Sequence, residues 1–292
     1  MLCTAKRLKS YKLKCIDGEI GHAKDFYFDT RHWTVRYLSM ETGGWLSGRK
    51  VMVSPYALDS IVHSEQYLSC TLTKEQIENG PSLNYDQLVS PQFETDYHGY
   101  FGWPLYWDGP HSWGKYPYVR CDHDQWSDYT DSKAWTPHLQ NTRDVSGHQL
   151  HVTDGKSGHI DDFIINVKTW MIRYLIVSLR DWWSENKVLI SPRWVDRISN
   201  GESKIFVDFS CESLKRSPKY TEESLLTLNC ETELYLNYQS ANEEMEKIVQ
   251  RGAKTPNQSK LKQPIACASR SRRHFIDLQN LPSDMQTHCH GE

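Results

Sequence analysis

Two histidine–aspartate pairs with identical spacing are the first residues in this chain that could do chemistry. His22 lies three positions before Asp25, and His159 lies three positions before Asp162. Imidazole and carboxylate groups both bind zinc, but a closed zinc centre usually needs four ligands. Two ligands favour the alternative, in which each histidine sits in a turn and hydrogen-bonds to the backbone or to a nearby carboxylate.

The densest group of metal-ligand residue types follows Cys121. It reads Cys121-Asp122-His123-Asp124 and continues with Asp128 and Asp131. Its spacing matches neither a zinc finger nor the calcium-loop pattern. We therefore interpret it as a solvated acidic linker and expect no bound metal, with a metal enzyme built on this cluster as the weaker alternative.

Catalytic motifs are absent from the rest of the sequence as well. The chain has no Gly-x-Ser-x-Gly, no phosphate-binding loop and no dinucleotide fingerprint. We therefore expect a protein that is not an enzyme, with no catalytic residue and no cofactor.

Arg36 and Arg173 are the most unusual charges, because each lies within an apolar segment with the pattern of a β-strand. A guanidinium in such a place must be paired or must reach solvent. We expect each to meet a carboxylate such as Asp25 or Asp162, or to stack on a neighbouring tryptophan.

These residues belong to a repeat of about 45 residues that occurs twice, 137 positions apart and without a gap. Residues 17–62 and 154–199 are identical at eighteen of forty-six positions, where unrelated segments would share roughly three. An internal duplication is therefore established before any element is assigned. The residues that define it are Gly21, Asp25, Trp33, Arg36, Tyr37, Trp45 and Pro55 in the first copy, and Gly158, Asp162, Trp170, Arg173, Tyr174, Trp182 and Pro192 in the second.

The elements that must position these residues are short β-strands separated by turns. The first copy predicts strands over 11–16, 20–28, 33–40, 45–54 and 61–72, and a capped helical turn over 73–77. Asp17-Gly18 and Thr42-Gly43-Gly44 supply the turn residues. Short strands at this spacing indicate a small antiparallel barrel or sandwich. Both faces of the 33–40 strand are largely apolar, so we expect one face to fill the barrel and the other to be covered by the sister copy or a connecting segment.

The repeated landmarks resemble the PRC-barrel family. They include an Asp-Phe strand, a Trp-x-x-Arg-Tyr-Leu strand, Thr42-Gly43-Gly44-Trp45 and a Lys-Val segment ending in Ser-Pro. The family is named after the cytoplasmic part of the photosynthetic reaction centre H subunit, and a related barrel ends a ribosome-maturation factor. The resemblance implies a small β-barrel used as a binding or assembly module, without a shared active site.

We therefore expect a mainly β protein made of two small antiparallel PRC-type barrels in tandem, with short helical turns. The predicted segments are a first barrel (1–80), an aromatic-rich arm (81–145), a second barrel (146–218), a C-terminal arm (219–251) and a disordered tail (252–292). The two barrels are expected to pack as a pseudo-symmetric pair.

The aromatic-rich stretch over 97–118 has three open interpretations: a strap packed on the barrels, a docking site for a partner, or a platform for a small molecule or sugar. Its glycines and prolines argue against a long helix. As partner-binding residues we single out Trp103, Tyr106, Trp107 and Trp113, because aromatic anchors dominate interface energetics. The predicted function is that of a cytoplasmic adaptor that docks a protein partner. The arm resembles segments that follow such barrels in bacterial proteins, so we expect a bacterial protein.

Bulk composition limits the alternatives. The formal net charge is −3, which gives no general attraction to nucleic acid, so an RNA- or ribosome-associated role is the weakest candidate. No apolar run is long enough to span a bilayer, so a role as a peripheral subunit of a membrane complex would need a partner that has a span. Eight cysteines without matching places in the two copies favour free thiols in a reducing compartment. A homo-oligomer stays possible.

Overall fold

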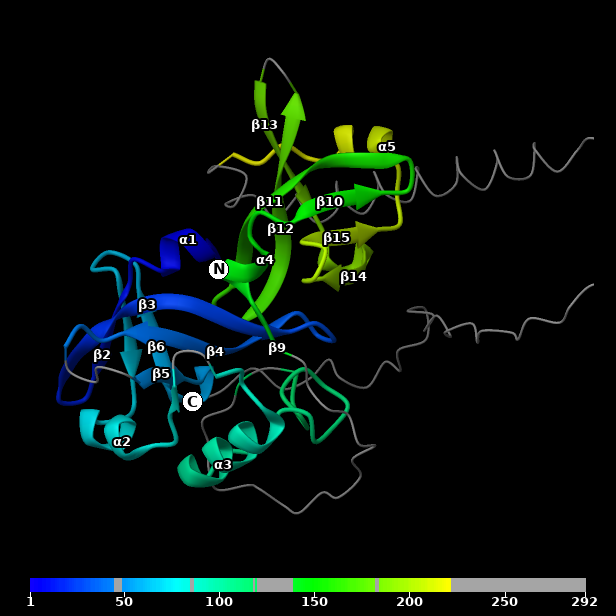
Figure 1. Cartoon of the computed structure of the whole chain (residues 1–292). Helices are drawn as coiled ribbons and strands as arrows, with labels where there is room; N and C mark the ends of the chain where they lie inside the picture. Colours follow the sequence, from blue (N-terminus) through cyan, green and yellow to red (C-terminus); the bar gives the residue numbers. More distant parts are fainter. Residues whose placement is uncertain (45–48, 85–86, 118, 120–138, 182–183, 222–292) are drawn as a thin grey trace, which may run out of the picture. The chain divides into compact units, whose positions relative to one another are not determined.

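The computed structural model describes residues 1–44, 49–84, 87–117, 119, 139–181 and 184–221. The chain divides into two compact units, Met1–Val249 and Gln250–Glu292, and all described residues lie in the first. Trp45, Trp182, the Cys121–Asp131 cluster and the 252–292 tail lie outside the described residues, so the expectations for them stay predictions. The described part is mainly β, as expected (Figure 1).

The first copy comprises the elements between Leu2 and Asn84. Its elements are β1 (Leu2–Thr4), α1 (Ala5–Leu8), β2 (Lys12–Cys15), β3 (Gly18–Asp29), β4 (Thr34–Glu41), β5 (Arg49–Val53), the 3₁₀ turn η1 (Pro55–Ala57), β6 (Leu58–Val62), β7 (Tyr67–Cys70), α2 (Lys74–Asn79) and β8 (Leu83–Asn84). The arm begins with α3 (Pro91–Phe101).

The second copy repeats this order. Its elements are β9 (Leu139–Asn141), α4 (Thr142–Val145), β10 (Gln149–Val152), β11 (Gly155–Asn166), β12 (Met171–Asp181), β13 (Ser184–Ile190), η3 (Pro192–Trp194), β14 (Val195–Ser199), β15 (Lys204–Val207) and α5 (Cys211–Lys215). Residues 218–220 bond to β13 as β8 bonds to β5. The 137-residue offset therefore holds from Leu2 onward, and the structural repeat is longer than the stretch of clear sequence identity.

Local sequence explains several of these boundaries. Thr73 caps α2 with Gln76 in a complete capping box, as the sequence predicted. The helix α3 begins at the Ser90 cap with Pro91 in its first turn and ends at Gly102, whose φ of 69° is left-handed. Residues 97–101 are the last part of α3, where Gly99 is tolerated at a cost of about 1 kcal/mol. No long helix runs on through the described residues of 102–117, as glycine and proline predicted.

The strand order is open at both ends. In the described residues it runs β14-β15-β10-β11-β12-β4-β3-β2-β7-β6, with β13 bonded to β12 and β5 bonded to β4. No closed barrel is formed by these ladders, which corrects the expectation of two closed barrels. At η1 and η3 a capping serine is followed by a proline, and the chain turns there. The strands that flank each turn, β5 and β6 in the first copy and β13 and β14 in the second, are therefore not hydrogen-bonded to each other.

The two copies exchange their first strands. β1 pairs with β11 of the other copy through Thr4↔Ile164, and β9 pairs with β3 through Tyr27↔Asn141. Two further bonds follow the same exchange: the Val35 amide donates to the Trp170 carbonyl (2.8 Å), and the Ile172 amide donates to the Trp33 carbonyl (2.6 Å). Each contact has its counterpart 137 residues away, which is the pattern of an isologous interface inside one chain.

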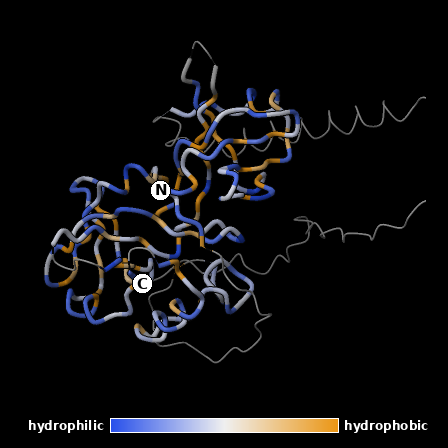
Figure 2. The backbone as a smooth tube through the Cα atoms, in the orientation of Figure 1, coloured by the Kyte–Doolittle hydropathy of each residue, from blue (hydrophilic) through white to orange (hydrophobic). Residues whose placement is uncertain are grey.

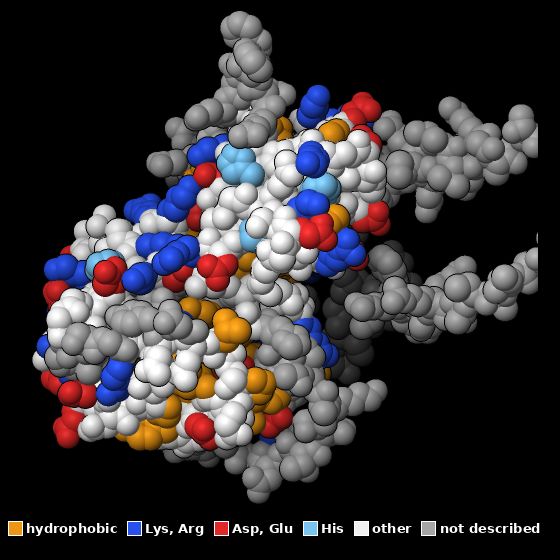
Figure 3. All heavy atoms as spheres, viewed as in Figure 1, with side chains coloured by type: hydrophobic (Ala, Val, Ile, Leu, Met, Phe, Trp, Pro, Cys, Tyr) orange, Lys and Arg blue, Asp and Glu red, His pale blue; other side chains and the backbone are white. Residues whose placement is uncertain are grey.

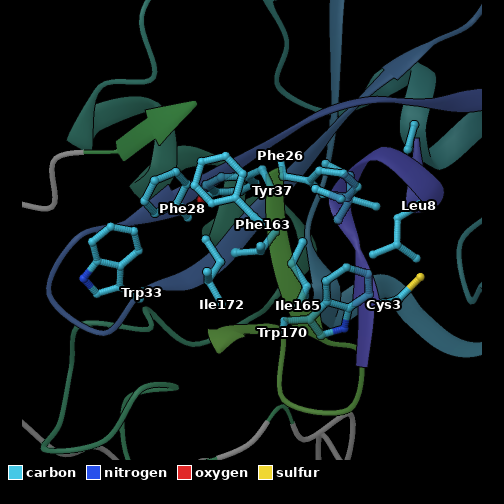
Figure 4. Packing of buried hydrophobic residues seen from close by; sticks show 14 of the residues in the cluster. Cys3, Leu8, Phe26, Phe28, Trp33, Tyr37, Phe163, Ile165, Trp170 and Ile172 are labelled. Carbon is cyan, nitrogen blue, oxygen red and sulfur yellow. The ribbon is translucent and has the colours of Figure 1, made fainter. Parts of the chain in front are cut away.

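A shared hydrophobic core lies where the copies meet. Phe28, from β3, packs on Trp33 at 5.3 Å and on Phe163, from β11, at 5.8 Å between ring centroids (Figure 4). Ile172 and Trp170 are also buried there. Figure 2 shows hydrophobic residues concentrated along the strands and polar residues on the connecting turns. The sister copy thus packs on Phe28 of β3, whereas Tyr37 of β4 packs on Phe93 and Tyr97 of the arm. Both covers that the sequence left open, the sister copy and a connecting segment, therefore lie against these strands.

Candidate functional site

The two histidine–aspartate pairs do not come together. His22 lies 3.5 Å from the Glu41 carboxylate at the surface, whereas Asp25 is buried and accepts hydrogen bonds from the Thr142 hydroxyl and the Arg143 amide. The described residues contain no group of three or more His, Cys, Asp or Glu that could hold a metal ion. Asp25 is therefore part of the bonding between the copies.

Asp162 has the reciprocal role in the second copy. Its carboxylate accepts from the Lys6 amide at 3.2 Å, which is the counterpart of the Arg143–Asp25 bond. Burial raises the pKa of Asp162 to about 6, and hydrogen bonds from the amides of Phe163 and Lys6 oppose this rise. Both repeated aspartates thus bind the first turn of the short helix that the other copy contributes.

Arg36 lies at the centre of a polar cluster buried beneath the arm. Its side chain is fully buried, and Nε donates to Asp29 Oδ2 at 2.8 Å. The guanidinium carbon lies 3.9 Å from the centre of the Tyr106 ring and 4.7 Å from that of Trp113. The expectation of a carboxylate partner or a stacked tryptophan was correct in kind, but the carboxylate is Asp29 and not Asp25.

The charge of Arg36 controls the ionisation of Asp29. Burial alone would raise the pKa of Asp29, but the Arg36 guanidinium and hydrogen bonds from His32 outweigh it, and the pKa lies below its usual range. The pair is therefore ionised at neutral pH, with the aromatic rings of the arm closing over the cation.

Glu94 and His98 carry the helix α3 into the same cluster. The Tyr106 hydroxyl donates to Glu94 Oε1 at 2.7 Å. Burial raises the pKa of Glu94 to about 7, although the hydrogen bond from Tyr106 and the positive charge of Arg36 oppose this rise. Glu94 is fully buried, and its carboxyl group gains or loses a proton near neutral pH.

His98 is held as a neutral imidazole. Burial lowers its pKa to about 4. The Pro104 carbonyl, 2.7 Å from Nδ1, can only accept a hydrogen bond, so Nδ1 carries the proton and Nε2 accepts from the Tyr37 hydroxyl at 3.0 Å. His98 thus links β4 to the segment that follows α3.

The Arg36–Asp29 ion pair has no counterpart at the corresponding positions of the second copy. Arg173 occupies the place of Arg36 but is only partly buried, and the position of Asp29 is taken by Asn166. The polar cluster is therefore a property of the first copy and its arm, although the arginine is common to both.

The four aromatic residues singled out in the arm differ in exposure. Trp103, Tyr106 and Trp113 are buried, and Trp107 is partly buried against Tyr106 at 4.7 Å. The Trp113 indole Nε1 donates to the Thr169 carbonyl of the second copy at 3.0 Å. The arm is thus packed on the strands, and a direct role of these residues in docking stays a prediction.

An open pocket of about 400 Å³ lies beside the end of α3. It is lined by Thr71, Leu72, Gln76, Tyr100, Phe101 and Trp103. The rings of Phe101 and Trp103 are stacked at 4.6 Å, and Tyr100 is 49% exposed. Figure 3 shows hydrophobic side chains gathered on the face over α2 and α3.

Comparison with protein families gives a match to the PRC-barrel domain over residues 151–214. Residues 151–214 are a PRC-barrel domain. The matched segment runs from β10 to α5, and the first copy shows the same order of elements. A comparison with curated proteins gives no match.

Sequence reasoning missed Asp29, Glu94 and His98 as members of the cluster and Tyr100 as the exposed aromatic residue. Asp29 differs between the copies, so the repeat did not mark it. A helical pattern over 91–101, signalled by Ser90-Pro91 and Gly102, would have placed Glu94, Tyr97 and His98 on one face.

Proposed function

We propose that this protein is a non-enzymatic adaptor in which two copies of one PRC-type module support a docking face for a protein partner. The face comprises α2, the C-terminal end of α3 and Trp103. The observation that carries the proposal is the exposed Tyr100 beside an open, aromatic-walled pocket. Exposed aromatic side chains next to a preformed pocket are typical of binding surfaces.

The polar cluster supports the proposal because it fixes α3 from below. Tyr97, on the inner side of α3, donates to the Met52 carbonyl at 2.9 Å, while Glu94 and His98 bind the cluster. Tyr100 and Phe101 then follow on a helix that is already ordered. A face ordered before binding costs less entropy on association.

The lining of the pocket indicates the kind of side chain that fits it. It contains no charged residue, and its polar groups are those of Thr71, Gln76 and Tyr100. We therefore propose that the partner inserts an uncharged side chain that also forms hydrogen bonds, such as tyrosine, against the rings of Phe101 and Trp103.

The absence of catalysis is part of the same proposal. Glu94, His98 and Tyr106, whose pKa values are shifted by burial, lie under the arm and line neither the pocket beside α3 nor the pocket around Lys156 and His159. Their position suits the fixing of the arm. No helix among the described residues is long and apolar enough to cross a bilayer.

Site-specific photo-crosslinking in the native host tests this function. A photo-reactive amino acid at position 100 should give one dominant protein adduct, whereas the same group at Ile16, which is 70% exposed on a strand turn, should not. Adding Phe101→Asp to the position-100 protein should remove the adduct while circular dichroism stays unchanged. Equal crosslinking from both positions, or none from position 100, would overturn the proposal.

A further inference from the structure

A second pocket, of about 540 Å³, lies in the second copy between the β10–β11 hairpin, β12 and α5. Its polar lining is formed by Gln149, Lys156, Ser157, His159 and Lys215, and Leu179 and Cys211 add apolar surface. Volumes of this size are typical of small-molecule sites. Nothing in the adaptor function requires it.

The pocket has a physical origin in the divergence of the two copies. Position 157 corresponds to Ile20, which is 3% exposed in the first copy, and position 211 corresponds to Lys74. Lys74 places its Nζ 3.2 Å from where a Cβ on Gly18 would lie. Serine and cysteine replace these two larger side chains in the second copy, and the space that they leave belongs to the pocket.

The charges have diverged in the same place. Lys156 and Lys215 stand where the first copy has Glu19 and Glu78. In the first copy Glu19 pairs with Lys12 at 3.0 Å, but the counterpart of Lys12 is the neutral Gln149. The two exposed lysines of the pocket form no ion pair with any described residue.

The histidine of the pocket has also lost its acidic neighbour. In the first copy His22 lies beside Glu41, whereas Ser178 occupies the equivalent position next to His159. Asp154 accepts from the Cys211 amide at 2.7 Å, as Asp17 does from the Lys74 amide. Because both copies keep that bond, it does not offset the new positive charge.

We propose that this pocket binds a small organic molecule through a phosphate group. Two lysines match the charge of a phosphate monoester, which is about −1.5 to −2 at neutral pH. The Ser157 hydroxyl and the Gln149 amide supply neutral donors. Leu179 and Cys211 form the wall against which the carbon part of the ligand packs. The volume exceeds what a bare ion needs, which favours a phosphate ester.

The test uses the full chain and glycerol phosphate as the probe, at constant ionic strength. The amide ¹H and ¹⁵N resonances of Ser157, Gly158 and His159 should shift in a saturable way, whereas glycerol should leave them unchanged. Inorganic phosphate should compete for the same residues with lower affinity. Lys156→Glu and Lys215→Glu, which restore the residues of the first copy, should each weaken binding by roughly 10- to 100-fold.

Lys168→Glu is the matched control, because it makes the same charge change at an exposed position of the second copy outside the pocket. It should leave the affinity within about twofold. The proposal fails if glycerol phosphate produces no saturable shift, if the Lys156→Glu and Lys215→Glu proteins bind as the unmodified chain does, or if Lys168→Glu weakens binding as much as they do. Since both pocket variants carry residues that fit the first copy, a folded spectrum is expected for each.

Discussion

Asp29→Asn tests whether the buried ion pair holds the arm in place. The substitution keeps the shape of the side chain and reproduces Asn166, the residue at the same position of the second copy. It leaves the fully buried Arg36 guanidinium without its carboxylate, while the rings of Tyr106 and Trp113 stay against it. Breaking a buried pair from one side costs about 3–5 kcal/mol, and the remaining aromatic contacts favour the lower end of that range.

The measurement is the free energy of unfolding from urea denaturation, followed by tryptophan fluorescence because Trp113 stacks on the guanidinium. A loss of about 3 kcal/mol corresponds to a fall in Tm of roughly 6–12 °C for a unit of this size. The pKa of Asp29 is lowered on folding, so its contribution is present above the unfolded pKa and is lost as the pH falls through the folded pKa. The difference between the two proteins should therefore shrink in acid.

Asp161→Asn is the control for this experiment. Asp161 forms ion pairs with Lys6 and Lys187, both at 2.8 Å, but these pairs are open to solvent. The same chemical change there should cost less than about 1 kcal/mol. If Asp29→Asn costs no more than Asp161→Asn, the argument that the Arg36 pair anchors the arm is wrong.

Three further changes have expected outcomes. Burial raises the pKa of Glu94 from 4.5 to about 7. The contribution of Glu94 to the free energy of unfolding should therefore be greatest below pH 4.5 and should fall by up to about 3 kcal/mol as the pH rises through 7. In the Glu94→Gln protein, the free energy of unfolding from urea denaturation should change less over this pH range. Trp170→Ala, at a buried residue whose carbonyl accepts from Val35, should cost about 3–5 kcal/mol in calorimetry. Gly158→Ala should cost about 2 kcal/mol or more, because φ is +113° and a Cβ would lie 2.3 Å from the Ser178 carbonyl.

Each of these outcomes has a matched control. Tyr100→Ala removes an exposed ring and should cost less than about 1 kcal/mol, so an equal loss for Trp170→Ala would contradict the shared core. Gly201 has open space around its Cβ direction, and Gly201→Ala should stay within about 0.5 kcal/mol. A Glu94→Gln protein with an unchanged pH profile would mean that another group titrates in this window.

The repeat in the sequence predicted the fold of the second copy well because turns and caps are local. Asp17-Gly18 and Asp154-Gly155 both lie where a long strand begins, and the capping box at Thr73 forms as expected. Such features depend on residues within a few positions of one another. Because the second copy repeats these turns and caps 137 residues later, the elements assigned to the first copy also predict those of the second.

The exchange of first strands could not be predicted in the same way. β1 and β11 are paired over a separation of more than 150 residues, and no local signal selects that partner over β3 of the same copy. The choice of Asp25 as the partner of Arg36 failed for a related reason. A bulge between Ala23 and Asp25 changes the register of β3 against β4, and a shift of one residue moves a side chain to the other face.

The differences between the copies indicate how one duplicated scaffold came to hold two distinct surfaces. Where the first copy keeps Asp29, its arginine is buried and neutralised, and the arm can close over it to present Tyr100. Where the second copy has lysines in place of Glu19 and Glu78, positive charge is left at the rim of an open pocket. The bonds between the copies are meanwhile symmetric: Asp25 and Asp162 each accept an amide from the other copy. Because these bonds hold the pair together, residues outside them were free to diverge, and the two sites should respond independently to substitution.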